Sequence, residues 1–228
     1  MRKVVLVLLV ICCFGGWALA EEAGFSNLIY GVDQGTKDLK AVYSQPVRVD
    51  YKKSALAFLG TFTASLLDKS VFAASSSLNF LDPVAEIITK TVEPIGLGIM
   101  YTAFGWKNKE LARKIVGSSL FTAINTVSLK HLIGKARPYA SSRPLYIGPN
   151  LKTDYNSFPS GHTSLSFSLA TVLSSEYPDY SVLFYSWSSC VGLSRILLER
   201  HWIGDVVGGA ITGTASARFY LESVREEP

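Results

Sequence analysis

The chain has 228 residues, of which 48% are hydrophobic, and it carries 22 Lys and Arg residues against 18 Asp and Glu residues. So mild a charge balance argues against a nucleic-acid-binding protein, which needs a strongly basic face. The length suits one domain with a sizeable core, and no low-complexity linker or internal repeat indicates a second domain.

Residues 1–20 have the pattern of a secretory signal. A basic start precedes an apolar run over 4–14, and small residues at 18–20 stand before Glu21, which is the usual order of a signal and its cleavage site. We therefore expect an exported protein whose mature chain starts near Glu21; an uncleaved membrane anchor is the alternative. Cys190 is the one cysteine of that mature chain, so no internal disulfide is expected.

Residues 21–53 mix charged, polar and scattered apolar residues, which predicts a surface leader with at most one short amphipathic helix. From residue 54 the texture changes to uncharged stretches with little strict polar–apolar alternation, which favours helices over strands. We expect one all-α domain over 54–220, with helices at 54–67, 70–81, 94–106, 115–129, 163–175, 180–194 and 206–217.

The uncharged stretches are too short to decide whether the domain lies in a membrane. None of them reaches the roughly 20 apolar residues of a spanning helix, so buried core helices and membrane spans both remain open. The segment 136–159, which is rich in Pro and Gly, is a long interruption in the series of predicted helices. A loop of that length in a compact domain usually has a function.

Lys130 and Arg137 bracket the predicted end of one helix, which Pro138 terminates. Both cations therefore lie at an end of the helical domain, where they can converge on one anion. A guanidinium binds phosphate oxygens in a bidentate manner, whereas an ammonium acts as a mobile point charge. A solvated cap that interacts with the helix dipole is the alternative interpretation of this pair.

A second motif, Pro159-Ser160-Gly161-His162, directly precedes an uncharged stretch. This order predicts a tight turn at a helix N-terminus, where free backbone N–H groups and the helix dipole favour an anion. Gly161 lets the backbone approach the anion closely. Ser160 either adds a hydroxyl donor or only caps the helix, and His162 is either a general acid or a structural histidine.

A third motif begins with Ser194-Arg195 and continues through His201 to Asp205. The i, i+4 spacing places His201 and Asp205 on one face of a helix, so the carboxylate can accept from one imidazole nitrogen while the other nitrogen stays free. This is the arrangement of an oriented nucleophile. The alternative is a purely structural His–Asp hydrogen bond.

Together, in this order and at this spacing, the three motifs resemble the signature of the type 2 phosphatidic acid phosphatase superfamily. That superfamily contains lipid phosphatases, bacterial class A acid phosphatases, glucose-6-phosphatase and vanadium haloperoxidases. The motifs span 130–205, and the helical texture from about 54 to 217 is similar to the family's helical core. The resemblance implies an all-α helical bundle of the haloperoxidase type with apolar helices.

The resemblance also implies roles for eight residues. His201 would attack phosphorus to give a phosphohistidine, Asp205 would orient it, and His162 would protonate the leaving group. No metal and no other cofactor is implied, because cations supply the electrostatic stabilisation. The residues implied to bind the phosphate are Lys130, Arg137, Ser160, Gly161 and Arg195.

The substrate implied by this resemblance is a lipid phosphate or diphosphate, of the class of phosphatidic acid, phosphatidylglycerophosphate, undecaprenyl diphosphate or lipid A. The third motif lacks the extra serine expected near the aspartate in soluble class A acid phosphatases, which favours the lipid branch. We expect membrane association and a site facing the periplasm, with no nucleic-acid or protein partner implied. The alternatives are a vanadium haloperoxidase, a broad-specificity periplasmic acid phosphatase and an inactive lipid-binding envelope protein.

Overall fold

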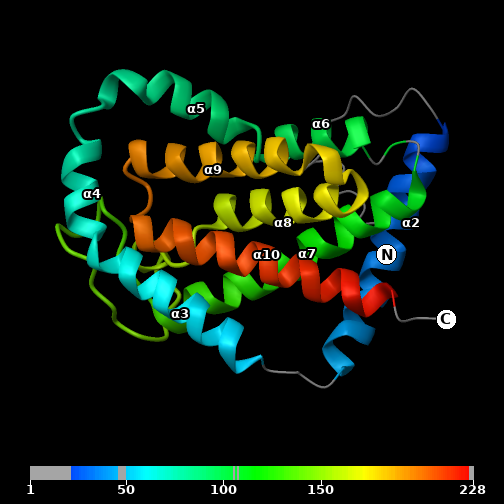
Figure 1. Cartoon of the computed structure of the whole chain (residues 1–228), viewed down its shortest axis with the longest axis horizontal. Coiled ribbons are helices and arrows are strands. Elements are labelled where there is room, and N and C mark those ends of the chain that lie inside the picture. The colour runs from blue at the N-terminus through cyan, green and yellow to red at the C-terminus, as the bar shows by residue number, and fades with distance from the viewer. Residues whose placement is uncertain (1–21, 46–49, 105, 107, 226–228) are drawn as a thin grey trace.

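The structure is a computed structural model that describes residues 22–45, 50–104, 106 and 108–225 (Figure 1). The predicted signal at 1–20 lies outside the described residues. Within these described residues, 3-10 turns lie at Asn79–Leu81, Thr153–Tyr155 and Pro178–Tyr180. The α-helices of the described part are α2 (Glu22–Ser44), α3 (Tyr51–Leu66), α4 (Asp68–Ser75), α5 (Asp82–Lys90), α6 (Pro94–Phe104), α7 (Lys109–Ile133), α8 (Gly161–Glu176), α9 (Ser181–Leu197) and α10 (Ile203–Arg225).

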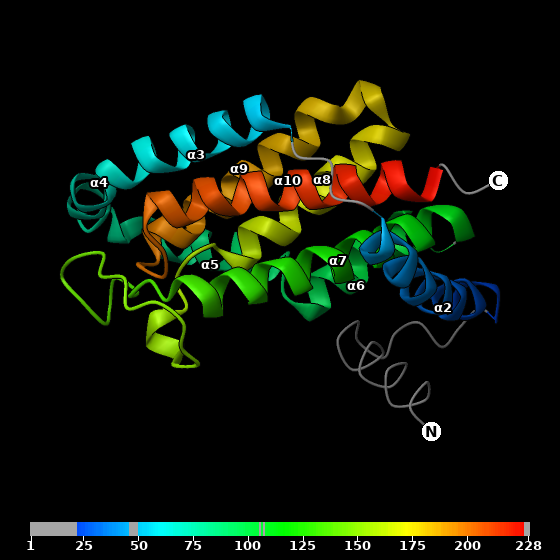
Figure 2. The ribbon, with the colours of Figure 1, turned by 90° about the horizontal axis from the view of Figure 1, so that it is seen from below.

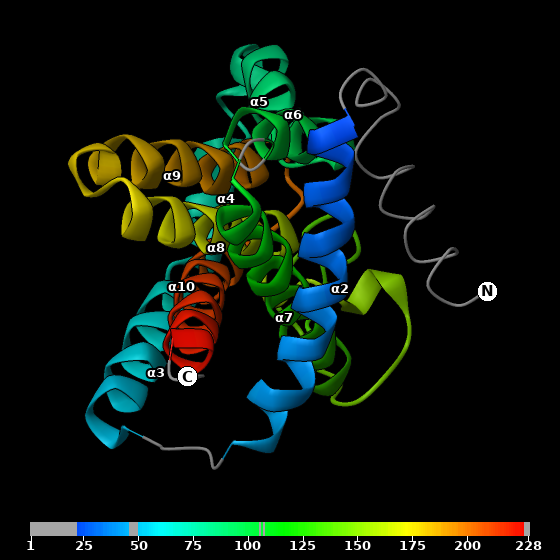
Figure 3. The same ribbon diagram turned by 90° about the vertical axis from the view of Figure 1, so that its right-hand side faces the viewer.

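The centre of the molecule consists of α7, α8 and α10, which pack against one another along the long axis (Figures 1 and 3). On the outside, α3 lies beside α10, α5 beside α9, and α2 along α7. The main hydrophobic cluster joins α7, α8 and α9 through Leu111, Ile115, Leu169, Leu173 and Phe184. The described residues form no β-strand, and the predicted all-α fold is confirmed.

Two glycines of α10 let that helix approach α8 closely. A Cβ atom at Gly213 would collide with the backbone of Ser164, and one at Gly209 would come within 2.8 Å of the Ser160 carbonyl oxygen. Side chains at these positions would force the two helices apart. The close packing brings the N-termini of α8 and α10 side by side, which matters because each N-terminus carries a predicted site motif.

The ends of α7 are determined by its flanking residues. Asn108 caps the N-terminus, since its Oδ1 accepts hydrogen bonds from the amides of Glu110 and Leu111 at 3.1 and 3.0 Å. At the C-terminus, Gly134 adopts a left-handed conformation with φ of 62°. A Cβ there would also collide with the Gly148 carbonyl. The chain therefore leaves the helix just after Lys130 and enters the long loop predicted over 136–159.

The N-terminal part differs from the predicted surface leader. Instead of one short helix, α2 has 23 residues and packs along α7, with Leu28, Val32 and Val42 buried. These apolar residues lie far apart within a segment rich in charges, so their contribution to a core was not visible in the local composition. The prediction also missed α5, whose three charged side chains, Asp82, Glu86 and Lys90, interrupt any uncharged run.

No single helix among the described residues has the length and apolar character needed to cross a membrane, although α3 and α4, which meet at a bend of 52°, meet that criterion together.

Candidate active site

Four helix ends meet at one end of the bundle, on the left in Figure 1. There α7 and α9 finish while α8 and α10 begin, and the loop between α7 and α8 closes over them, as Figure 2 shows from below. The three sequence motifs lie on these helix ends and on the adjoining loops. Distant parts of the chain are therefore gathered in one place, and two helix N-termini contribute their positive dipole ends to it.

Lys130 and Arg137 are held by one residue of the loop, Asn156. The Lys130 ammonium donates to the Asn156 carbonyl at 2.7 Å, and the Arg137 Nε and Nη2 donate to its Oδ1 at 3.0 and 2.8 Å. A neutral amide orients both cations without neutralising either. Burial, together with the neighbouring Arg137 and Arg195 charges, lowers the pKa of Lys130 to about 7.

Arg195, at the C-terminal end of α9, supplies a third cation. Its side chain is buried, and its Nη1 donates to Thr89 Oγ1 of α5 at 3.2 Å. The Arg195 Nε is buried and has no hydrogen-bond partner among the described residues. A buried donor without a partner costs free energy, which an anionic oxygen would recover. Burial and the charges of Arg137 and Arg200 lower the pKa of Arg195 to about 10.

The second motif forms the first turn of α8, as predicted. Ser160 stands at the N-cap position, but its side chain makes no capping hydrogen bond to the helix; instead its Oγ accepts from Thr163 Oγ1 at 2.9 Å. Gly161 faces Lys130, whose Cε lies 3.8 Å from the position of a Cβ on that glycine. The helix N-terminus and the Lys130 side chain thus border the same space.

His162 stands in the first turn of α8, among the cations. Burial and the charges of Arg195, Lys130 and Arg137 lower the pKa of His162 to about 4. All three predicted phosphate-binding cations therefore influence this one imidazole. A dianionic phosphate beside them would offset their charge and raise the pKa of His162, so the protonated form would be favoured when an anion binds.

Asp205 lies in the first turn of α10, whereas His201 lies two residues before that helix begins, so the pair does not share a helix face as predicted. Both residues are buried. His201 Nδ1 is 3.6 Å from Asp205 Oδ2 and 3.4 Å from Ser157 Oγ, and Ser157 donates to the same carboxylate oxygen at 2.5 Å. Nδ1 thus faces the carboxylate, and Nε2 makes no hydrogen bond with any described residue. Burial, which outweighs Asp205, lowers the pKa of His201 to about 3, and the nearby Lys130 and Arg137 add to this effect.

Asp205 stays ionised although it is fully buried. Burial opposes its ionisation, yet the adjacent His201 imidazole and the charge of Lys135 lower its pKa to about 2. Its Oδ2 also accepts from the Trp202 amide at 3.0 Å. A permanently charged, fixed carboxylate behind an imidazole favours one tautomer and stabilises positive charge on the ring.

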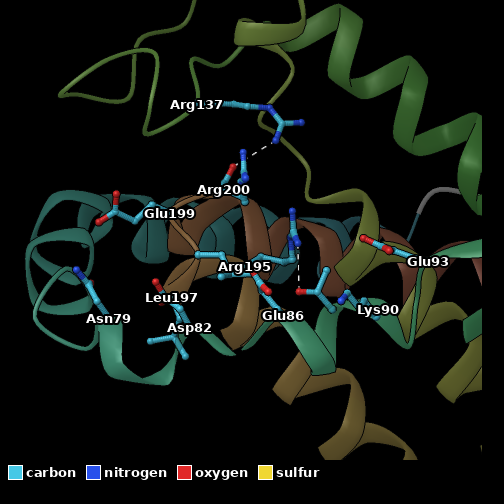
Figure 4. A pocket seen from close by; sticks show the side chains of 12 residues that line it. Asn79, Asp82, Glu86, Lys90, Glu93, Arg137, Arg195, Leu197, Glu199 and Arg200 are labelled. Carbon is cyan, nitrogen blue, oxygen red and sulfur yellow. Dashed lines mark hydrogen bonds between the residues drawn. The ribbon is translucent and has the colours of Figure 1, made fainter. Parts of the chain in front are cut away.

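The mouth of the site is a polar cavity of about 650 Å³ between α5, the end of α9 and the loop that carries Arg137 (Figure 4). In Figure 4, Arg137 approaches from the loop and Arg195 from α9, with Glu86 and Glu93 of the α5 side nearby. Arg137 Nη1 also donates to the Arg200 carbonyl at 3.4 Å. The cations are therefore reachable from outside through an opening that carries charges of both signs.

The eight predicted site residues lie together, but the sequence motifs did not include the residues that hold them. Asn156 and Ser157 stand in a loop with no recognised motif, and Thr89 stands in the helix that was not predicted. Lys135 lies between Lys130 and Arg137 in the chain, but the motif assigns no role to a residue at that position. Asp68 is far from every motif in the chain, so only the folded structure associates it with the site.

Comparison with known proteins agrees with this site. The sequence pattern of the PAP2 superfamily matches residues 112–227. A lipid A 1-phosphatase of Porphyromonas gingivalis is 31% identical over 142 residues, covering 58% of this chain and 28% of that protein. An acid phosphatase of Zymomonas mobilis is 34% identical over 80 residues, covering 31% of this chain and 30% of that one. The match thus spans less than a third of either relative.

A solved structure, that of Aquifex aeolicus LpxE, has the same fold. It superposes with a TM-score of 0.55 at 22% identity, and the match covers 68% of this chain and 95% of that one. The family pattern includes all three motifs and covers half of the sequence. This chain is a member of the PAP2 superfamily.

Proposed function

We propose that the protein is a metal-independent phosphatase that hydrolyses a lipid phosphate or diphosphate through a phosphohistidine. The observation that carries the proposal is the position of the His201–Asp205 pair, which lies at the same helix ends as Lys130, Arg137 and Arg195. A nucleophile with a fixed carboxylate behind it and three cations in front of it is suited to attack phosphorus.

In the proposed first step, His201 Nε2 attacks phosphorus and the bond from phosphorus to the leaving oxygen breaks. His162 gives its proton to that oxygen, so the leaving group departs as the neutral lipid alcohol or, from a diphosphate, as the singly protonated lipid phosphate. In the second step, water attacks the phosphohistidine, the P–N bond breaks, and His162 takes the proton of the water. Inorganic phosphate is released and both histidines return to their starting states.

The cations have two functions in this proposal. They neutralise the charge on the phosphoryl oxygens, with the Arg137 and Arg195 forks suited to bidentate contact. They also make the protonation of His162 depend on the substrate, because they lower the pKa of His162 until a phosphate dianion offsets them. The acid would therefore be charged when a substrate needs it.

The proposed lipid substrate and membrane association are supported by the exposed apolar face of α3. Phe58 is 73% exposed and Leu66 is 67% exposed, and Phe58 stacks on Phe62 with ring centroids 6.1 Å apart. An apolar patch of this kind on an otherwise folded surface marks an interaction site. The names of the relatives point to lipid phosphates as well. We place the protein in the cell envelope, exported, with its site on the periplasmic side.

The test is a substrate panel with purified protein in EDTA. We expect phosphate release from at least one of phosphatidic acid, phosphatidylglycerophosphate, undecaprenyl diphosphate and lipid A, and a slower release from p-nitrophenyl phosphate. No release from any of them would overturn the proposal. Bromide oxidation that requires vanadate and peroxide, without phosphate release, would assign the site to a haloperoxidase instead.

A further inference from the structure

A fully buried chain of charges lies behind the proposed nucleophile. Lys135 Nζ is 2.8 Å from Asp205 Oδ1 on one side and donates to Asp68 Oδ2 at 2.7 Å on the other. The side chains of Asp68, Lys135 and Asp205 are at most 1% exposed. Ion pairs so deep in a protein cost desolvation free energy, and replacement by apolar residues is often neutral or stabilising. This cost suggests that the chain of charges serves more than stability.

The two carboxylate oxygens of Asp205 have different partners and different roles. Oδ1 is paired with Lys135, whereas Oδ2 accepts from Ser157 Oγ and the Trp202 amide and faces His201 Nδ1. Oδ1 accepts no hydrogen bond from the described residues, so its ion pair with Lys135 is the contact that opposes rotation of the carboxylate plane. The orientation of the imidazole therefore depends on Lys135 as well as on Asp205 itself.

Asp68 links this arrangement to α4. Its Oδ1 accepts from the Gly204 amide in the first turn of α10 at 2.8 Å, while Oδ2 accepts from Lys135. Burial alone would lower the pKa of Lys135, but Asp205 and Asp68 outweigh burial and raise it. Lys135 is therefore charged at neutral pH and bridges the two carboxylates.

The number of charges explains why a second carboxylate is present. Lys135 and Asp205 alone would form a neutral pair, and such a pair would do little to stabilise positive charge on His201. Burial raises the pKa of Asp68, but Lys135 and the Gly204 amide oppose this effect and favour the carboxylate. With Asp68 ionised, the three side chains carry one net negative charge. That charge opposes Lys130 and Arg137, the cations that face His201 from α7 and from the loop, and it favours the positive ring of a phosphohistidine.

We propose that Lys135 and Asp68 are positioning residues of the catalytic centre: they hold Asp205 in the orientation that directs His201 and give the group its net negative charge. This inference rests on the proposed function. It goes beyond the three motifs, since Asp68 belongs to none of them and Lys135 lies between Lys130 and Arg137 without being one of the predicted site residues.

The first test is Asp68→Asn, which keeps an oxygen for the Gly204 amide and removes one charge. We expect kcat to fall on the order of tenfold or more with KM unchanged, because the phosphate-binding residues are untouched. The matched control is Asp38→Asn, at the other end of the bundle, where Asp38 is equally buried and pairs with Arg113. This control should lose stability and keep its kcat.

The second test is the double variant Asp68→Asn with Lys135→Met, which removes one negative and one positive charge. It leaves Asp205 with its own net charge of minus one but removes the ion pair that holds Oδ1. Therefore kcat should recover in part from the level of Asp68→Asn and stay below that of the wild type. A purely structural role predicts the opposite, since the double variant loses more contacts than the single one. A double variant with lower kcat than Asp68→Asn, or a single variant with the kcat of the wild type, would overturn the proposal.

A readout independent of turnover separates this proposal from the proposed function. With ¹⁵N-labelled histidine, we expect His201 at neutral pH to carry its proton on Nδ1 in the wild type and in the double variant, and to show a mixture of tautomers in Asp68→Asn. If no substrate is hydrolysed but the tautomer changes in this way, the positioning stands and the phosphatase assignment falls. If the tautomer is the same in all three proteins, the positioning is wrong.

Discussion

Buried ion pairs lie at both ends of the bundle, and they differ in how their charges are matched. At the end away from the site, Asp38 of α2 accepts from Arg113 of α7 at 2.8 and 2.7 Å and from Tyr220 Oη of α10 at 2.5 Å. Carboxylates fully match the cation there, because Arg113 also lies 3.7 Å from Glu110 Oε2. Consequently Asp38, chiefly through its hydrogen bonds, raises the pKa of Arg113.

At the site, the cations exceed the anions that face them. Lys130, Arg137 and Arg195 contact Asn156 and Thr89, which are neutral acceptors. Burial and mutual repulsion lower the pKa of Lys130 to about 7 and that of Arg195 to about 10. One end of the bundle thus uses ion pairs to join helices, whereas the other holds cations whose matching charge has to come from a ligand.

The largest expected effect comes from removal of the proposed nucleophile, which should change only the site end of the bundle. His201→Ala should lower kcat by about 10⁴-fold or more and abolish any acid-labile phosphoenzyme, because the proposed nucleophile is gone. His131→Ala is the matched control: its Nδ1 lies 2.9 Å from the Asn150 carbonyl and belongs to no proposed step. Rapid quenching with radiolabelled substrate measures both variants. A phosphoenzyme in His201→Ala would assign the nucleophile to another residue.

A second effect depends on the leaving group. His162→Ala removes the proposed proton donor, a loss of roughly 10²–10⁴-fold for an alkyl phosphate, whose alkoxide leaves poorly without a proton. The loss should be much smaller for p-nitrophenyl phosphate, since p-nitrophenolate leaves unaided. Steady-state rates of His162→Ala and wild type on both substrates measure this difference. Equal losses on the two substrates would mean that His162 binds or supports the site instead of donating a proton.

Replacement of one arginine by lysine at each end of the bundle tests the comparison of the two ends directly. Arg195→Lys keeps the charge but loses the fork, so kcat/KM should fall by roughly 10- to 100-fold with little change in thermal stability. Arg113→Lys loses a bidentate contact to Asp38 and should lower the free energy of unfolding by about 1–3 kcal/mol with kcat unchanged. Denaturant unfolding and kinetics on both proteins measure these effects. The comparison fails if the two variants show the same profile.

The sequence predicted those parts of the site that depend on residues close to one another in the chain. His201 and Asp205 are four residues apart, and the Gly161 turn adjoins its helix, so local spacing was enough to find them. Gly134 ends α7 so that Lys130 and Arg137 face one another across a few residues. Asp68 and Thr89 reach the site only because α4 and α5 pack across it, and no local pattern reports a contact of that kind.

The same limit explains the prediction that failed at the other end of the molecule. Asp38 lies in a segment whose composition indicated a surface leader, yet it is buried by Arg113 and Tyr220 from two distant helices. A charged residue indicates exposure unless its partner is known. Buried ion pairs are therefore the features that sequence patterns predict least well, both at the site and at the other end of the bundle.

The smallest expected effect concerns the proton balance of anion binding. At pH 8, Lys130, whose pKa is about 7, is mostly neutral, and His162, whose pKa is about 4, is neutral. Inorganic phosphate is mainly a dianion at this pH, and it stabilises the charged forms of both groups. Phosphate binding should therefore take up protons from solution, more than zero and at most about two per site.

Isothermal titration calorimetry in two buffers of different ionisation enthalpy measures this proton uptake. Lys130→Arg should reduce it, because a guanidinium stays charged at pH 8 and has no proton to gain. Lys114→Arg is the control, since Lys114 pairs with Glu176 at the other end of the bundle, at 2.9 Å, and should leave the uptake unchanged. The sign follows from the direction of the pKa shifts: a group whose pKa is lowered in the free protein gains a proton when the cause of the lowering is offset. Proton release on phosphate binding, or an uptake that Lys130→Arg does not change, would show that the cations of the site are already matched, as they are at the opposite end.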